Sequence, residues 1–446
     1  MRLLSNYLTI TLIVLMLLNH VVNLSVLNII IGSLTFIVIC LVIYTSSRIN
    51  QFFAVSMLLV SMCILIYQKA PMNFWFNAIT NNLPLVSLIV LSPMLSIPVT
   101  LGKYDYYINN FILKYTKKAN QLYFVISSLF FLLSPLLNLG SIHLIHSIIN
   151  RLKLPKQFLG RVYIRAFFSA STWAPYFASV FLVIYYLKIP IKSYLGFGLI
   201  LSIAQIIISY LLYTFWEDKN IDLKIPTANS DIRGVKVLEF IFVLIFIVCS
   251  IFLLEGIFET NIVVLITSII LIYTFIWTVY LRKITEFASH LKQFFRSIIP
   301  RSSNEIVLFL SAGFFAIVIS HTHFGDFINV YWLRIGEVSI YLLIILTIIV
   351  ISTISFTGIH HIVTISIILT TVDYNILGIS DLTMAMILLS SYAMGAIVSP
   401  VSPANVIVAN IINGSVYKVI IKYNLIYTIV TIIIHSIIIY LFYLLL

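Results

Sequence analysis

Charged residues and cysteine are scarce in this sequence. Only 9% of the 446 residues are charged, whereas 61% are hydrophobic, and the mean hydropathy is +1.12. A soluble core cannot absorb that much apolar sequence, so the composition excludes a soluble globular protein and predicts a polytopic membrane protein. The cysteines Cys40, Cys63 and Cys249 are scattered through apolar runs. They indicate neither a disulfide framework nor a metal site.

The motifs of several enzyme classes are also absent. There is no Walker-type nucleotide-binding loop, so ATP-driven transport by this chain alone is not expected. The loops between apolar segments are short and carry neither paired carboxylates nor a Ser/His/Asp set. These absences argue against an integral-membrane enzyme of glycan or lipid-linked metabolism, and we expect no cofactor and no enzymatic activity. Such an enzyme stays open as an alternative function for the chain. A membrane partner protein without transport activity is another alternative.

Apolar segments long enough to cross a bilayer follow one another along the chain. The first of them has no small-residue cleavage site after it, so we interpret it as a retained span and not as a signal peptide. The sequence predicts an all-α fold with about eleven transmembrane helices. We place these spans at 7–22, 24–46, 50–67, 84–101, 165–187, 193–216, 236–256, 261–281, 304–322, 383–412 and 419–446.

The net charge of +12 lies mostly in short loops. Basic residues gather at 102–121, 151–165 and 282–303, and positively charged loops stay on the cytoplasmic side of a membrane. Loops 255–261 and 373–381 carry acids and no bases, which suits the outer side. The charge therefore predicts orientation and not nucleic-acid binding. We expect a multi-pass protein of the inner (cytoplasmic) membrane with its N-terminus in the cytoplasm.

Two further apolar stretches, 122–150 and 337–372, are each flanked by loops on one side of the membrane. The first is too short for two full spans of about 20 residues each. Both stretches therefore predict re-entrant helical hairpins that enter from opposite sides. Their tips are expected at 138–141 and 357–360, where glycine and polar residues interrupt the apolar sequence.

Two spans are broken by proline and hydroxyl-bearing residues. Segment 171–175 interrupts span 165–187, and segment 399–403 interrupts span 383–412. Proline removes a backbone donor, and in hydrocarbon such a defect is tolerated only where protein or a water-filled cavity pairs the backbone. Interrupted spans at corresponding positions of two halves are a typical sign of a transporter's binding site.

The order of hairpin and broken span repeats along the chain. Because the hairpins enter from opposite faces, the sequence predicts an inverted repeat with two discontinuous helices. The predicted parts are N-terminal helices at 1–83, a first repeat at 84–235, connecting helices and a loop at 236–303, and a second repeat at 304–446.

This pattern resembles the ion-transporter superfamily, which includes the divalent anion/sodium symporters and related antiporters. The resemblance covers 84–446 and rests on the architecture, on segment 304–313, on Gly-Ile-His at 358–360 and on the two breaks. It implies a secondary active transporter whose hairpin tips face the broken helix of the same repeat and hold a cation beside the solute. Neither tip contains the Ser-Asn-Thr signature of the symporters, so a di- or tricarboxylate substrate is not implied.

The resemblance also implies binding residues. The first tip would face the first break, and the second tip would face the second break. The expected solute- and ion-binding residues are Asn138, Gly140, Ser141, Ser171, Thr172, Thr357, Gly358, His360, Ser399, Ser402 and Asn405.

A broken span offers two kinds of helix end. Free N–H groups at the start of a half-helix suit an anion, and free carbonyls at the end of the other half suit Na⁺. We therefore expect a small, anionic solute, with Na⁺ or H⁺ as the coupling ion. Besides the solute we expect contact with the lipid bilayer and none with nucleic acid, and a homodimer is left open.

Titratable residues are few in the expected spans. Glu239, Glu305 and Glu337 lie at span starts, and the lack of a carboxylate near a span centre counts against Na⁺/H⁺ exchange. His143 and His360 lie near the two tips and could relay a proton, although each could instead be a neutral structural histidine. No cysteine or carboxylate accompanies them, so we expect no metal site.

Overall fold

The computed structural model describes residues 2–104, 106–108, 118–152, 154–175, 177–217, 234–257 and 262–445. In these ranges the chain is helical and contains no strand. The reason is that hydrocarbon cannot pair backbone N–H and C=O groups, and a helix pairs them within its own segment.

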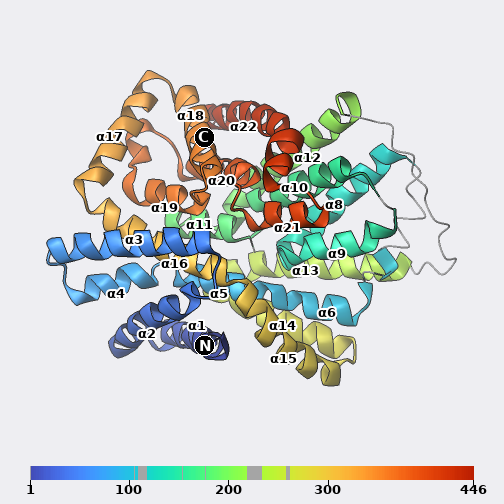
Figure 1. Ribbon diagram of the computed structural model, residues 1–446, viewed down its shortest axis with the longest axis horizontal. Helices are drawn as coiled ribbons and strands as arrows, with labels where there is room; N and C mark the ends of the chain where they lie inside the picture. Colours follow the sequence, from blue (N-terminus) through green and yellow to red (C-terminus); the bar gives the residue numbers. More distant parts are fainter. Residues whose placement is uncertain are drawn as a thin grey trace.

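The N-terminal helices lie on one side of the molecule, drawn in blue in Figure 1. Ser47 starts one of them, because its side chain accepts a hydrogen bond from the Asn50 backbone N–H. The helices pack on one another and on the later helix α16 (Ser303–Ser320). They are α1 (Arg2–Val22), α2 (Ser25–Ile43), α3 (Arg48–Tyr67) and α4 (Met72–Thr80).

The first half then follows the order expected from the sequence. A bent span leads to a helix pair, a broken helix and a long helix. The elements are α5 (Leu83–Leu91), η1 (Ser92–Leu95), α6 (Ser96–Leu101), α8 (Ala119–Leu137), α9 (Gly140–Ile149), η2 (Asn150–Leu152), α10 (Lys156–Ser169), η3 (Ala170–Thr172), α11 (Ala178–Leu187) and α12 (Ile191–Phe215).

The middle of the chain forms α13 (Gly234–Ile257), α14 (Ile262–Tyr280) and α15 (Ile284–Arg301). The last of these occupies a segment that we expected to be a loop, 282–303. Phe287, Leu291 and Phe294 recur there at helical spacing and pack against the core, with Phe294 only 1% exposed. That apolar stripe makes α15 an amphipathic helix, which the charge count of the segment had obscured.

The second half repeats the order of the first. We expected a loop at 323–336, before the apolar stretch 337–372. This segment is instead helix α17, so that prediction was wrong. The elements are α16, α17 (His323–Val338), α18 (Ile340–Phe356), α19 (His361–Thr371), η4 (Tyr374–Leu377), α20 (Asp381–Val398), α21 (Pro403–Ile411), the π-helical segment η5 (Lys418–Asn424) and α22 (Leu425–Leu445).

The broken helix of the second half lies at the centre of the fold. An 18-residue apolar window within Asp381–Ile411 is 94% buried, against 39% for the window within Lys418–Leu445 and 33% for that within Arg48–Tyr67. Helix α20 packs against α10, α11, α12, α18, α19 and α22, which come from both halves. The polar break that follows α20 is therefore enclosed by protein, as a break in a membrane helix must be.

By length and composition, eight helices in the described part of the chain could cross a membrane. We expected about eleven, and the other three expected spans, 7–22, 165–187 and 261–281, contain the shorter apolar helices Leu4–His20, Ala178–Leu187 and Val264–Tyr280. The chain is thus an all-α polytopic membrane protein. The full count of spans, the re-entry of the two helix pairs, the opposite orientation of the halves and the four-part division of the chain stay predictions.

Candidate functional site

A short turn joins α8 to α9 where we predicted the first hairpin tip. Asn138 takes a positive φ of 46° at this turn. The Ser141 hydroxyl donates to the Asn138 carbonyl oxygen at 2.7 Å and lies 3.0 Å from the Ser134 hydroxyl. Ser141 therefore stabilises the turn from inside, and Gly140 beside it is exposed.

A second turn joins α18 to α19 at the other predicted tip. Gly358 has a φ of +103°, which residues with a side chain rarely adopt, and a Cβ atom there would lie 4.0 Å from Val401 of the second break. His360 starts α19, and its Nδ1 accepts from the Ile362 backbone N–H at 3.3 Å. The exposed Thr357 donates its hydroxyl to the Ile354 carbonyl oxygen at 2.6 Å.

The second break is held by Asn405. Its side-chain nitrogen donates to the carbonyl oxygens of Ala396, Ile397 and Ser399 at 3.1, 2.9 and 2.8 Å. These carbonyls end α20, where no further helical turn pairs them. The Asn405 Oδ1 atom and the Ser399 hydroxyl are buried and have no hydrogen-bond partner.

The first break is held by side chains in a comparable way. Ser179 donates to the Ser171 carbonyl oxygen at 2.6 Å, and Tyr194 donates to the Thr172 carbonyl oxygen at 2.8 Å. The Ser171 hydroxyl donates to the Phe168 carbonyl oxygen at 2.6 Å. At both breaks, carbonyls that we expected to be free for Na⁺ are hydrogen-bonded to side chains of the protein itself.

One cavity of about 60 Å³ is lined by residues of the two turns, of the second break and of the segments on either side of the first break. The residues that precede α9, α11, α19 and α21 as N-caps are Leu139, Phe177, His360 and Ser402, and all four line this cavity. Four helices thus begin at the same place. Helix starts carry unpaired N–H groups and a positive partial charge, so the arrangement favours an anion.

Three of the predicted binding residues line this central cavity, namely Asn138, His360 and Ser402. His143 is exposed on α9 and does not line it. The other predicted residues lie in the turns or the breaks around it and are not among its lining residues: Gly140, Ser141, Ser171, Thr172, Thr357, Gly358, Ser399 and Asn405.

Three polar residues of the cavity were not among the expected binding residues, namely Glu305, His361 and Tyr392. Glu305 is partly exposed, but its Oε2 atom is buried and has no hydrogen-bond partner. We took the lack of a carboxylate near a span centre as evidence against Na⁺/H⁺ exchange, yet Glu305 at the start of α16 lines the cavity. Helix α19 runs beside α16, since Thr370 donates to the Ala316 carbonyl oxygen at 3.2 Å, and this brings the turn to Glu305.

His361 is 2% exposed, and neither of its ring nitrogens has a hydrogen-bond partner. Its ring centroid lies 4.1 Å from that of His360 and 4.3 Å from that of Tyr392, which it meets edge to face. Gly395 on α20 permits this approach, because a Cβ atom there would lie 3.2 Å from the His361 Cβ and 2.9 Å from the Ser355 hydroxyl. The His-His sequence at 360–361 was the available signal for this cluster.

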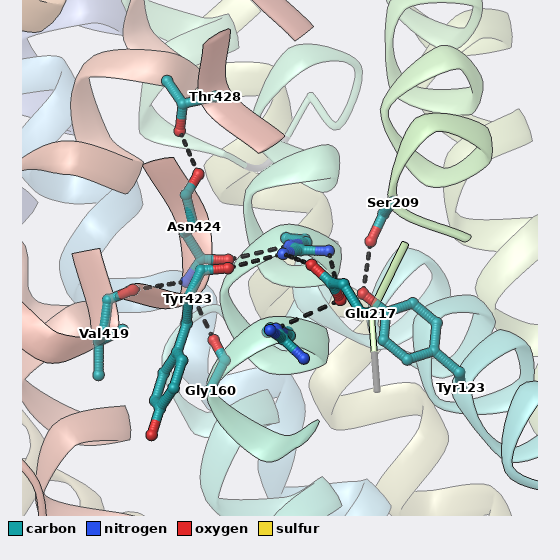
Figure 2. Close-up of polar contacts among 10 residues, drawn as sticks. Tyr123, Gly160, Ser209, Glu217, Val419, Tyr423, Asn424 and Thr428 are labelled. Atoms are coloured by element: carbon teal, nitrogen blue, oxygen red, sulfur yellow. Dashed lines mark hydrogen bonds and ion pairs between the residues drawn. The ribbon is translucent and has the colours of Figure 1, made fainter. Parts of the chain in front are cut away.

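A second missed feature is a buried charge network at the start of the first broken helix. We expected Arg165 in a cytoplasmic loop, but it lies within α10 and is 1% exposed. Its guanidinium donates to Glu217 Oε1 at 2.6 Å and to the Tyr423 carbonyl oxygen at 2.6 Å. Figure 2 shows Glu217, Tyr423 and Asn424 around these contacts. The prediction of a loop failed because the charge rule ignores a partner that arrives from elsewhere in the chain.

Across the described ranges, no group of three or more His, Cys, Asp or Glu side chains could hold a metal ion.

No family model matches the chain, and no curated protein matches it. A solved structure that it resembles is that of the YdaH transporter of Alcanivorax borkumensis, which has an unusual topology. The TM-score is 0.56 at 13% sequence identity, over 82% of this chain and 88% of that chain. This chain has the fold of a membrane transporter. At this identity the likeness concerns the fold alone, and membership of the ion-transporter superfamily stays a prediction.

Proposed function

We propose that the chain is a secondary active transporter that moves a small, anionic solute across the cytoplasmic membrane, coupled to Na⁺ or H⁺. The observation that carries this proposal is the central cavity, which is lined by both turns, by the second break and by residues on either side of the first break. The transporter-like fold supports it as well, since binding at broken helices near the membrane midplane is typical of secondary transporters.

The charge of the solute follows from the four helix starts at the cavity. Their N–H groups and partial positive charges stabilise an anion that is removed from water. Most of the other lining residues are apolar, such as Ile89, Phe167 and Phe309, so they exclude water and strengthen that attraction. No Lys or Arg in the described part of the chain lines the cavity, so the helix starts are its positive feature.

The size of the cavity describes the state of the transporter. A volume of about 60 Å³ holds about two water molecules. An organic anion needs more room, so binding of the solute requires the turns and the breaks to move apart. Alternating access then requires the turns to move away from the breaks on one side of the membrane at a time.

The proposal includes the arrangement in the membrane. The pairs α8–α9 and α18–α19 re-enter from opposite sides in an inverted repeat, and the N-terminus lies in the cytoplasm. Some of the binding residues predicted from the sequence line the cavity. The others lie in the turns and breaks beside it. The solute and the lipid are the partners that this function requires.

Uptake into proteoliposomes tests the function. Acetate, succinate, citrate and glutamate serve as probes under imposed Na⁺ and H⁺ gradients. We expect gradient-driven uptake of at least one probe, and we expect Ser402→Ala at the cavity to reduce it. Ser436→Ala is the matched control. Ser436 is fully buried in α22, where its hydroxyl donates to the Ile432 carbonyl oxygen, and it is not among the residues that line the cavity. Equal uptake by both variants would place the site elsewhere.

A further inference from the structure

We propose that Glu305 and His361 form a proton-binding site at the central cavity, and that the proton is the coupling ion. The coupling role rests on the proposed function, whereas the proton site does not. The site lies outside the residues that the sequence indicated, because Glu305 comes from α16 and meets the turn before α19 only in the folded chain.

Glu305 lacks the partners that a buried carboxylate needs. Its Oε2 atom is buried without a hydrogen bond, and it takes part in none of the ion pairs found within the described ranges. A carboxylate at such a position is costly unless a proton, a cation or a donor neutralises it.

His361 presents the complementary group. A neutral imidazole has one N–H donor and one acceptor nitrogen, and both His361 nitrogens are unpartnered in a 2% exposed side chain. His360 differs, because its Nδ1 atom already accepts from the Ile362 N–H. His361 is therefore the histidine of the pair that is free to take and release a proton at either nitrogen.

The surroundings contain few other titratable groups. The cavity is lined by Glu305 from α16, His360 and His361 at the start of α19, and Tyr392 from α20. The lining residues contributed by α5, α10, α11 and α21 are apolar, and Asn138 at the first turn and Ser402 at the second break are neutral. No Asp, Lys or Arg of the described chain lines the cavity, so Glu305 and His361 face no fixed counter-charge.

The donor types favour a proton over Na⁺. Hard cations take about six or more oxygen ligands. The lining side chains offer fewer, namely one carboxylate, one phenol, one amide and one hydroxyl besides two imidazoles, and the carbonyls at the end of α20 are held by Asn405. A proton needs only one lone pair. It adds to a carboxylate oxygen of Glu305 or to a ring nitrogen of His361, and no bond in the protein breaks.

Proton binding and anion binding reinforce each other at this site. Protonation removes the negative charge of Glu305 or adds a positive charge on His361, and either change favours an anion in the same cavity. Because coupling between two ligands is reciprocal, a bound anion also favours the proton. The arrangement therefore predicts that proton and anion move together, as in a symporter.

Infrared difference spectroscopy tests the proton site without any solute. The purified protein in phosphatidylcholine liposomes is titrated between about pH 5 and pH 8, the range in which histidine normally changes charge. We expect the carbonyl band of a protonated carboxylic acid to titrate in the wild-type protein and to be lost in Glu305→Gln. His361→Gln should move the midpoint of that band. Glu239→Gln is the control, because Glu239 pairs with Lys236 and Tyr104 and should leave the band unchanged.

An unchanged spectrum in Glu305→Gln would overturn the proton site, and elution of the variant as a monodisperse peak establishes that it has folded.

The coupling role is tested separately with liposomes that contain a pH-sensitive dye and receive each anion probe. We expect anion-dependent acidification of the liposome interior, which the enclosed dye reports, and its loss in Glu305→Gln. Uptake driven by Na⁺ alone, with no proton movement, would overturn the coupling role. Absence of any uptake would count against the proposed function, while the infrared titration would still decide the proton site.

Discussion

The Nε atom of Arg165 donates a hydrogen bond to Asn424 Oδ1 at 3.0 Å, which joins α10 of the first half to η5 of the second. Asn424 returns the contact, because its side-chain nitrogen donates to the Gly160 carbonyl oxygen at 3.1 Å (Figure 2). Glu217, directly after α12, balances the Arg165 charge. The two halves are thus connected by a buried polar network next to the first broken helix.

Removing Arg165 should destabilise the protein strongly. Arg165→Met removes the donor to the buried acceptors on Asn424 and Tyr423. It also removes the ion pair with Glu217, and breaking a buried ion pair costs about 3–5 kcal/mol. Arg161→Met is the control, because Arg161 also pairs with Glu217 but is 16% exposed. We expect it to lower the free energy of unfolding by about 1 kcal/mol or less. Unfolding in detergent micelles, followed by tryptophan fluorescence, measures both. Equal losses would mean that the network adds no stability.

The close contact between α20 and the second turn should not tolerate a methyl group. In Gly395→Ala the new Cβ would meet the Ser355 hydroxyl at 2.9 Å, and overpacking of a buried contact costs about 1–3 kcal/mol. Ser355→Gly in the same chain should recover part of the loss. Gly196→Ala on α12 meets nothing within 4 Å and should be neutral or stabilising by up to about 1 kcal/mol. Thermal unfolding of the variants compares them, and a neutral Gly395→Ala would contradict the packing.

Asn405 should matter more for stability than Ser171. Asn405→Leu removes the side-chain donor of three carbonyls at the end of α20, of which Ser399 keeps its bond from the Ser402 N–H, and an unpaired buried polar group costs about 1–3 kcal/mol. Ser171→Ala removes one local hydrogen bond, worth about 1 kcal/mol. We expect Asn405→Leu to lose both thermal stability and uptake, and Ser171→Ala to keep most of its stability. The reverse order would mean that Asn405 does not hold the break.

Cysteine labelling should show that both helix pairs re-enter. In a chain without its native cysteines, Lys118→Cys and Lys156→Cys flank α8 and α9 and should both react with an impermeant maleimide only from the cytoplasmic side. Glu337→Cys and Asp373→Cys flank α18 and α19 and should both react only from outside. All four positions are exposed. Reaction of one pair from opposite sides would make that helix pair a full crossing and remove the inverted repeat.

The sequence alone determined the features that arise from neighbouring residues. Apolar runs predicted the membrane helices, glycine and polar residues predicted the turns at 138–141 and 357–360, and proline with serine predicted the breaks at 171–175 and 399–403. Each of these signals acts within one or two helical turns, through backbone pairing and steric exclusion. A pattern in the sequence therefore reports them directly.

Only the tertiary structure decided which side chains meet. Arg165 lies 52 residues from Glu217 and 259 from Asn424, so an expected loop residue became a fully buried one when its partners arrived. Glu305 reached the central cavity because α19 packs along α16, and Asn405 turned back to occupy the carbonyls that were expected to bind Na⁺. Polar groups in an apolar interior must find partners wherever the packing of distant helices places them, and no local sequence pattern predicts that packing.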